Sequence, residues 1–202
     1  MKPSQSIATL LAALSLGLTC HVAQAKPLSK AAENELKSSI VNGYNSQLLV
    51  YLNKDKQSEE AYQFRYLEIW ERGQYDLVNY YTPDLAKQVK LFLKYYKANP
   101  KETDCHFPVL SGYKSTRSIQ YLPVDKNGNV PLLFIFGKRW SDTPMYSPVL
   151  YVFKGNRIDD IWVSFGVWKP WDQAKNVDYS EFNFSLRESM RLGINCYKAR
   201  SE

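Results

Sequence analysis

Two adjacent carboxylates, Asp159 and Asp160, are the residues of this chain best suited to acid–base chemistry. They lie near the start of an alternating run, Ile158 to Trp168, that predicts a β-strand. Because neighbouring strand residues point to opposite faces, we expect the two carboxylates to be separated rather than to act as a pair. Asp160 would share its face with Trp162 and Ser164, and such a mixed face either lines a concave pocket or points into water.

Histidine chemistry has little support in the sequence. His21 lies in an N-terminal segment that we expect to be removed, which leaves His106 as the one histidine of the mature chain. A Ser–His–acid or Cys–His mechanism would need that histidine beside a nucleophile, and its neighbour Cys105 is expected to be oxidised. The chain also lacks a Gly-x-Ser-x-Gly elbow, a His-Glu-x-x-His motif, a phosphate-binding glycine loop and a calcium loop. We therefore expect no catalytic residue set, no cofactor and no metal.

The first 25 residues have the order of a secretory signal peptide. Lys2 is followed by an uncharged, mostly apolar stretch from Ile7 to Leu18 and then by Ala23-Gln24-Ala25, a small-residue cleavage site. We expect the mature protein to begin at Lys26 and to be periplasmic or secreted. The apolar stretch is shorter than the roughly 20 residues that cross a bilayer, so we expect no transmembrane segment.

Cleavage after Ala25 would leave two cysteines, Cys105 and Cys196. A pair of cysteines in an oxidising compartment predicts a disulfide, with two free thiols or a metal site as the alternatives. Zinc would need three or four ligands, and Cys105, His106 and Cys196 supply only three, two of them adjacent. Cys20 could carry a lipid instead, but Gly17-Leu18-Thr19 departs from the usual lipoprotein pattern, so we expect no lipid anchor.

The charge of the mature chain is mildly basic. The full chain has a formal net charge of +6, and the loss of Lys2 reduces it to +5. Such a charge is compatible with attraction to anionic lipid headgroups or envelope phosphates. Lys and Arg are nevertheless spread along the sequence, with Lys138-Arg139 as the longest local cluster, which favours a solvated surface. No motif indicates nucleic-acid binding.

The elements that must position these residues begin with helices. A stripe of apolar residues with a spacing of four predicts a helix from Ser29 to about Asn53, and Ser58-Glu59-Glu60 opens a second helix that ends near Gly73. Thr82-Pro83-Asp84 predicts the start of a third, which Asn99-Pro100 ends. The residues expected on the stripe of the first helix are Leu36, Ile40, Tyr44, Leu48 and Leu52.

Extended segments follow Cys105. The predicted strands are 119–124, 132–140, 148–153 and 158–168, with turns at Asn127-Gly128 and at Lys154-Gly155-Asn156-Arg157. Residues 169–184 are expected to be a long loop, and Ser185-Leu186-Arg187-Glu188 predicts the capping box of a short final helix. The expected fold is α+β, with helices packed on a curved antiparallel sheet. We divide the chain into a signal peptide (1–25), an N-terminal helix (26–57) and one α+β domain (58–202).

Tryptophans cluster in the second half of the chain. Trp140, Trp162, Trp168 and Trp171 fall within 32 residues, and Arg139 precedes the first of them. Tryptophan and arginine together are typical of binding hot spots, although tryptophans are also ordinary core residues of sheet domains. Trp168 and Trp171 flank Pro170 in the predicted loop and are the better interface candidates.

Several motifs occur in an order that resembles a known family. They are Tyr62-x-Phe64-Arg65-Tyr66, Tyr80-Tyr81-Thr82-Pro83-Asp84-Leu85, Val130-Pro131-Leu132, a hairpin with Gly155, Ile158-Asp159-Asp160-Ile161, Gly166 and Leu186-Arg187-Glu188-Ser189-Met190. Over roughly residues 58–192 the chain resembles the YbjP/YqhG-type periplasmic proteins, a family of unknown function with a nuclear-transport-factor-2-like, or cystatin-like, cone. The resemblance implies a helical layer wrapped by a curved sheet and a place in the bacterial envelope. It implies no catalytic residues.

Our leading hypothesis is a non-enzymatic periplasmic domain that binds a protein partner, such as an immunity protein or inhibitor of an envelope hydrolase. One rival is a small-molecule carrier or a proton-transfer enzyme with a pocket in the cone, where Asp160 would be a general base whose pKa is raised by burial. The other is a structural accessory of an envelope complex.

Overall fold

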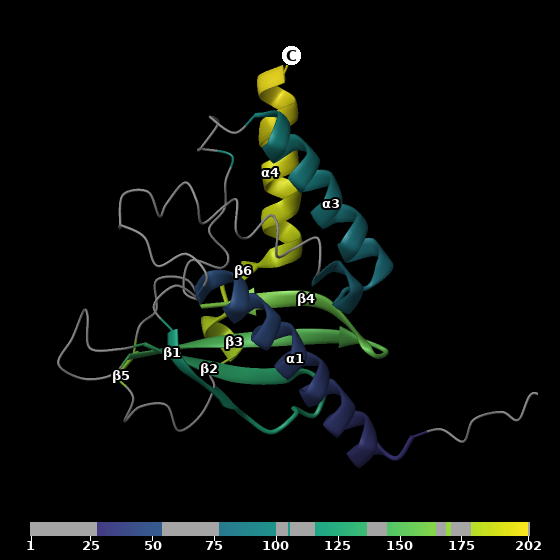
Figure 1. The fold of residues 1–202 in the computed structure, drawn as a ribbon, viewed down its shortest axis with the longest axis vertical. Coiled ribbons are helices and arrows are strands. Elements are labelled where there is room, and N and C mark those ends of the chain that lie inside the picture. The colour runs from purple at the N-terminus through teal and green to yellow at the C-terminus, as the bar shows by residue number, and fades with distance from the viewer. Residues whose placement is uncertain are drawn as a thin grey trace, which may run out of the picture.

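The computed structural model describes residues 28–53, 77–99, 105, 116–136, 145–164, 169–170 and 179–201. Its α-helices are α1 (Lys30–Asn53), α3 (Pro83–Ala98) and α4 (Leu186–Ser201), with short 3-10 turns at Val78–Tyr80 and Tyr179–Glu181. In Figure 1, α3 and α4 lie above the sheet and α1 crosses it. The expected signal peptide, the second predicted helix and the boundary between residues 57 and 58 lie outside the described residues.

The described strands form one antiparallel sheet with the order β1-β2-β3-β4-β6, and β5 also pairs with β3. The order follows the chain, and the described turns at Gly128 and Gly155 join β1 to β2 and β3 to β4. Gly128 and Gly155 both have positive φ, 78° and 60°, as the two predicted turns require. The strands are β1 (Thr116–Tyr121), β2 (Val130–Phe136), β3 (Met145–Lys154), β4 (Arg157–Val163), β5 (Lys169–Pro170) and β6 (Phe184–Ser185).

The α+β class is confirmed, but two details predicted for the chain after residue 168 are wrong. The segment 169–184 is not one continuous loop, because it contains β5, the turn at Tyr179–Glu181 and the start of β6. These elements are two or three residues long, too short to show a periodic pattern. The final helix is not short: α4 has 16 residues, as many as α3.

Helix α3 begins and ends where its local signals predict. Thr82 is the N-cap and its hydroxyl accepts from the backbone N–H of Leu85, Pro83 occupies the first turn, and Asn99 ends the helix. Its buried side carries Leu85, Val89, Phe92, Leu93 and Tyr96.

Helix α1 has the predicted length, but its buried side is rotated by about one residue from the predicted stripe. Lys37, Val41, Tyr44 and Asn45 are buried, whereas Ile40 is only partly buried. The aliphatic stem of Lys37 allows it to occupy such a position because its ammonium reaches Glu33, 2.7 Å away. The side chains of residues 48–53 lie outside the description.

One hydrophobic core joins the helices to a single face of the sheet. Alternate residues of β2, namely Val130, Leu132 and Phe134, belong to this core together with residues of α1, α3 and α4. The intervening Leu133 is buried as well, at 1% exposure, but lies on the other face. Both faces of the central strands are therefore shielded from water.

Helices α3 and α4 run side by side in the same direction. Near their starts, the amide of Gln88 donates to the carbonyl oxygen of Arg187 at 2.6 Å, and near their ends Tyr95 stacks on Tyr197 with 6.2 Å between ring centroids. Gly193 permits this close approach, because a Cβ at that position would lie 2.5 Å from Phe92 Cε2. Both helices thus begin at the sheet and carry their C-terminal ends away from it (Figure 1).

Candidate functional site

A β-bulge in β4 places the two candidate carboxylates. In the pairing of β3 with β4, Val152 lies opposite Asp160 and Phe153 lies opposite Ile158, so the register skips Asp159. An extra residue of this kind interrupts the alternation of side chains along a strand. Ile158 and Ile161 are consequently both core residues although they are three positions apart.

Asp160 is buried, with 7% of its surface exposed, and its carboxylate receives three hydrogen bonds. Oδ1 accepts from the backbone N–H groups of Ile161 at 2.8 Å and Arg187 at 3.0 Å, and Oδ2 accepts from the Ser185 hydroxyl at 2.5 Å. Burial raises the pKa of Asp160 above its ordinary value, while the bonds from Ser185, Arg187 and Ile161 oppose this rise. Asp160 thus acts as a distant cap for the first turn of α4.

Asp159 engages the same helix and also α3. Arg187 Nη2 lies 2.8 Å from Asp159 Oδ1 and 2.8 Å from the Asp159 carbonyl oxygen. The hydroxyl of Thr82, the N-cap of α3, donates to Asp159 Oδ1 at 2.8 Å. The backbone N–H of Thr82 in turn donates to the carbonyl oxygen of Ile158 at 2.8 Å. The bulge therefore anchors the starts of both helices.

This arrangement corrects the expectation that Asp159 and Asp160 have separate surroundings. The bulge allows both carboxylates to bind one residue, Arg187, through its side chain and its backbone respectively. The two carboxylates accept hydrogen bonds from residues at the N-terminal ends of α3 and α4. The described donors occupy both oxygens of Asp160.

The remaining predicted residues of this face have different environments. Trp162 is partly buried and pairs in register with Leu150 and Ser185. Ser164 is buried, with 3% exposure, and its hydroxyl has no hydrogen-bond partner among the described residues. Asp160 and Ser164 therefore do not point into water, which was one of the two alternatives for this face.

Four predicted binding residues, Arg139, Trp140, Trp168 and Trp171, lie outside the described residues, as does His106. Their role as an interface therefore stays a prediction.

Buried tyrosines occupy the space between α1 and the sheet. Tyr44, Tyr81 and Tyr151 are each at most 1% exposed, and the ring of Tyr44 lies 5.8 Å from that of Tyr81 and 5.5 Å from that of Tyr151. The Tyr44 and Tyr81 hydroxyls are 2.7 Å apart, and the Tyr151 hydroxyl donates to Asn45 Oδ1 at 2.6 Å. Sequence periodicity assigned Tyr44 to the core without revealing this polar network.

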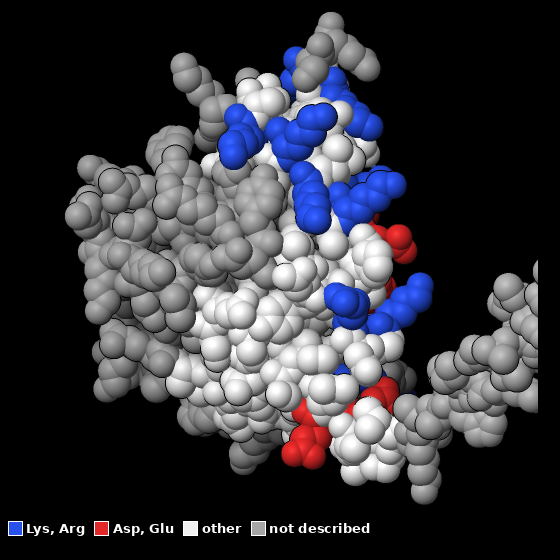
Figure 2. Space-filling model, turned by 45° about the vertical axis from the view of Figure 1, so that its right-hand side comes forward, with Lys and Arg blue, Asp and Glu red and all other residues white. Residues whose placement is uncertain are grey.

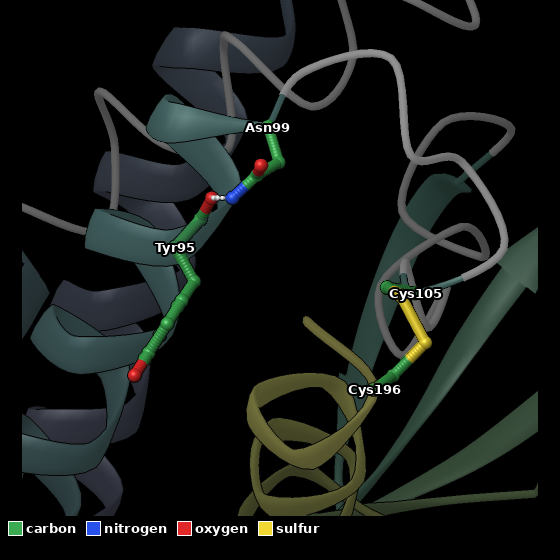
Figure 3. Close-up of a disulfide and its surroundings, with 4 residues drawn as sticks. All are labelled: Tyr95, Asn99, Cys105 and Cys196. Carbon is green, nitrogen blue, oxygen red and sulfur yellow. Dashed lines mark hydrogen bonds between the residues drawn. A yellow bond between two sulfur atoms is a disulfide. The ribbon is translucent and has the colours of Figure 1, made fainter. Parts of the chain in front are cut away.

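The predicted disulfide is present. Cys105 and Cys196 are bonded across 91 residues, with 5.5 Å between their Cα atoms. Figure 3 shows the bond joining α4 to the residue beyond the end of α3, where the Asn99 side chain donates to the Tyr95 carbonyl oxygen at 3.0 Å. A disulfide of this kind fits a protein that folds in an oxidising compartment.

A basic surface was not anticipated from the sequence. Lys87, Lys90, Lys94 and Lys97 are all exposed on α3, and Figure 2 shows Lys and Arg gathered over the part of the molecule where α3 and α4 lie. Their spacing of three, four and three residues places them on one side of the helix. The spacing of these lysines on the predicted helix is the sequence signal for this surface, because the distribution of charge along the chain does not show its distribution around the helix.

Two features of the described residues bear on the class of site. Within the described ranges, no group of three or more His, Cys, Asp or Glu side chains is placed to hold a metal ion. None of the helices described is both long and apolar enough to cross a membrane. No family model, curated protein or solved structure matches the chain.

Proposed function

We propose that this protein is a non-enzymatic binding domain of the bacterial cell envelope that recognises a protein partner. The observation that carries the proposal is that Asp160 is buried, at 7% exposure, and uses both carboxylate oxygens to bind groups of its own fold. A general base needs an oxygen that can reach a substrate proton. Both oxygens of Asp160 instead accept hydrogen bonds from Ile161, Arg187 and Ser185.

We place the protein outside the cytoplasm and assign the partner contact to two tryptophans. The disulfide between Cys105 and Cys196 supports folding outside the cytoplasm, in agreement with the signal peptide expected at residues 1–25. Trp168 and Trp171 are our candidates for the contact, because tryptophan is enriched at interface hot spots. An immunity protein or inhibitor of an envelope hydrolase is the sharper form of the proposal.

The test is capture of a partner from periplasmic extract, followed by reconstitution of the complex from purified components. We expect a binary complex of fixed stoichiometry that weakens at least about tenfold when Trp168 and Trp171 are both replaced by Ala. Leu28→Ala is the control, because Leu28 is an exposed apolar residue, at 57% exposure, in the first described segment. Equal binding by wild type and the double variant would refute the assigned contact, and the absence of any partner would refute the function.

One observation favours the rival, proton transfer at Asp160. Burial raises the pKa of this carboxyl, which is what a general base at neutral pH requires. The variant Asp160→Asn would distinguish between a protein-binding domain and a carrier or enzyme. A binding domain keeps its partner affinity if the variant folds, whereas a carrier or enzyme that depends on the carboxylate loses its ligand or its turnover.

A further inference from the structure

The lysines of α3 form a row along one side of the helix. Lys87, Lys90 and Lys94 are exposed, and none of them forms a salt bridge with a described residue. The acid of this helix, Asp84, lies in the first turn, three residues before Lys87 and therefore beside the start of the row, but it forms no salt bridge with a described residue. From Lys87 to Lys97 the row is about 15 Å long, at 1.5 Å per residue.

Helix α4 extends this basic surface. Because α3 and α4 run in the same direction, the last turn of α4, with Lys198 and Arg200, lies at the same end as Lys97. Glu188, the acid of α4, lies in its first turn and is already paired with Arg191. We call Lys87, Lys90, Lys94, Lys97, Lys198 and Arg200 the basic face (Figure 2).

The composition of the basic face distinguishes between classes of partner. Protein interfaces are enriched in Trp, Tyr and Arg and depleted in Lys. Lysine is a compact, flexible point charge, and five of the six residues are lysines. Such a surface suits a diffuse layer of negative charge better than a shaped protein epitope.

One apolar residue lies inside the row. Leu91 is 39% exposed and sits one helical turn from both Lys87 and Lys94. Exposed leucine between lysines is the pattern of helices that lie in the headgroup region of a bilayer, with cations at the phosphates and the apolar side chain just below.

We infer that the basic face docks the protein on a membrane surface rich in anionic phospholipid. The attraction is the sum of several charge contacts, each worth about a fivefold gain in affinity near an anionic leaflet. Membrane docking uses none of the residues assigned to the protein partner. It can therefore be tested independently of the proposed function.

The experiment uses the purified secreted protein, its N-terminus checked by mass spectrometry, in co-sedimentation with vesicles. One set contains phosphatidylcholine alone, and the other contains about 30% phosphatidylglycerol. We expect binding to the second set only, with loss of binding at high salt because the Debye length shrinks.

The variant K87Q/K90Q/K94Q should lose about a hundredfold in affinity. K30Q/K126Q/K154Q is the matched control, because it removes three exposed lysines outside the basic face and has the same net charge. Leu91→Ser should weaken binding to vesicles but not to soluble polyphosphate, which has no apolar layer.

Three results would overturn the inference. They are equal losses in the two triple variants, binding to neutral vesicles as strong as to anionic ones, and no vesicle binding by wild type. If the row instead cross-links to an acidic protein while vesicles remain unbound, the basic face is a protein interface and the lipid assignment is wrong.

Discussion

The backbone N–H of Arg187 donates to Asp160 Oδ1 at 3.0 Å, and this bond ties the first turn of α4 to strand β4. The same arginine reaches Asp159 with its side chain, and the oxygen that it contacts also accepts from Thr82, the N-cap of α3. Two helix starts, far apart in sequence, therefore depend on one bulge. This coupling gives both carboxylates a structural role.

Asp160→Ala should lower the free energy of unfolding by about 3 kcal/mol, because it leaves buried N–H groups without an acceptor. Asp160→Asn keeps one acceptor oxygen and should cost about 1 kcal/mol at neutral pH. Urea unfolding followed by circular dichroism measures both values. Asp84→Ala, an exposed acid in the first turn of α3, is the control and should cost less than about 1 kcal/mol. Equal effects at the two sites would contradict the capping role.

The raised pKa of Asp160 should make the protein less stable as the pH rises. Burial raises the pKa of Asp160 above 3.8, so the folded state binds this proton more tightly than the unfolded state does. The resulting stabilisation is complete below the unfolded pKa and is lost as the pH rises through the folded one. The free energy of unfolding of wild type, relative to Asp160→Asn, should therefore fall as the pH rises above about 4. A relative gain over that window would show that the hydrogen bonds outweigh burial.

Double-variant analysis should reveal the link between the two helices. Thr82→Val removes a donor to Asp159 Oδ1, and Arg187→Met removes the other donor to the same oxygen. Because the first change leaves Arg187 as the remaining partner of that oxygen, the two losses should differ from additivity by at least about 0.5 kcal/mol. Both changes also affect helix starts, so the unfolding energies of all four proteins must be compared. Strict additivity would mean that α3 and α4 are anchored independently.

The predictability of this fold from its sequence depends on how local each signal is. The bounds of α3 follow from Thr82, Pro83 and Asn99, which lie at the helix ends themselves. The two turn glycines are equally local. The disulfide required only a count of cysteines and an oxidising compartment.

The candidate site was less predictable because its determinants are distant. A period of two placed Asp159 and Asp160 on opposite faces, and only pairing with β3 reveals the bulge that breaks the period. The donors to Asp160 include Ser185 and Arg187, which are 25 and 27 residues away. Ser185 was expected to cap α4 alone, and it does accept from the Glu188 N–H at 3.2 Å, but its hydrogen goes to Asp160.

Removal of the disulfide should destabilise the protein strongly. In the chain-entropy description, a bridge across 91 residues contributes about 4.6 kcal/mol by restricting the unfolded chain. Cys105→Ala with Cys196→Ala should lower the free energy of unfolding by about this amount, and reduction of wild type should give a similar loss. Free thiols in denatured, unreduced protein would show that the bond does not form in the cell.

Gly193→Ala tests the close packing of α3 against α4. Within an isolated helix this change would be favourable by about 1 kcal/mol. Here the new Cβ would lie 2.5 Å from Phe92 Cε2 and 3.0 Å from the backbone oxygen of Cys105. The ring can shift only by disturbing the core, and the disulfide restrains Cys105, so we expect a net loss of about 2 kcal/mol. Asn195→Ala, at an exposed position on the same helix, should be neutral or slightly stabilising. If thermal unfolding showed Gly193→Ala to be as stable as Asn195→Ala, the two helices would not be in the close contact described.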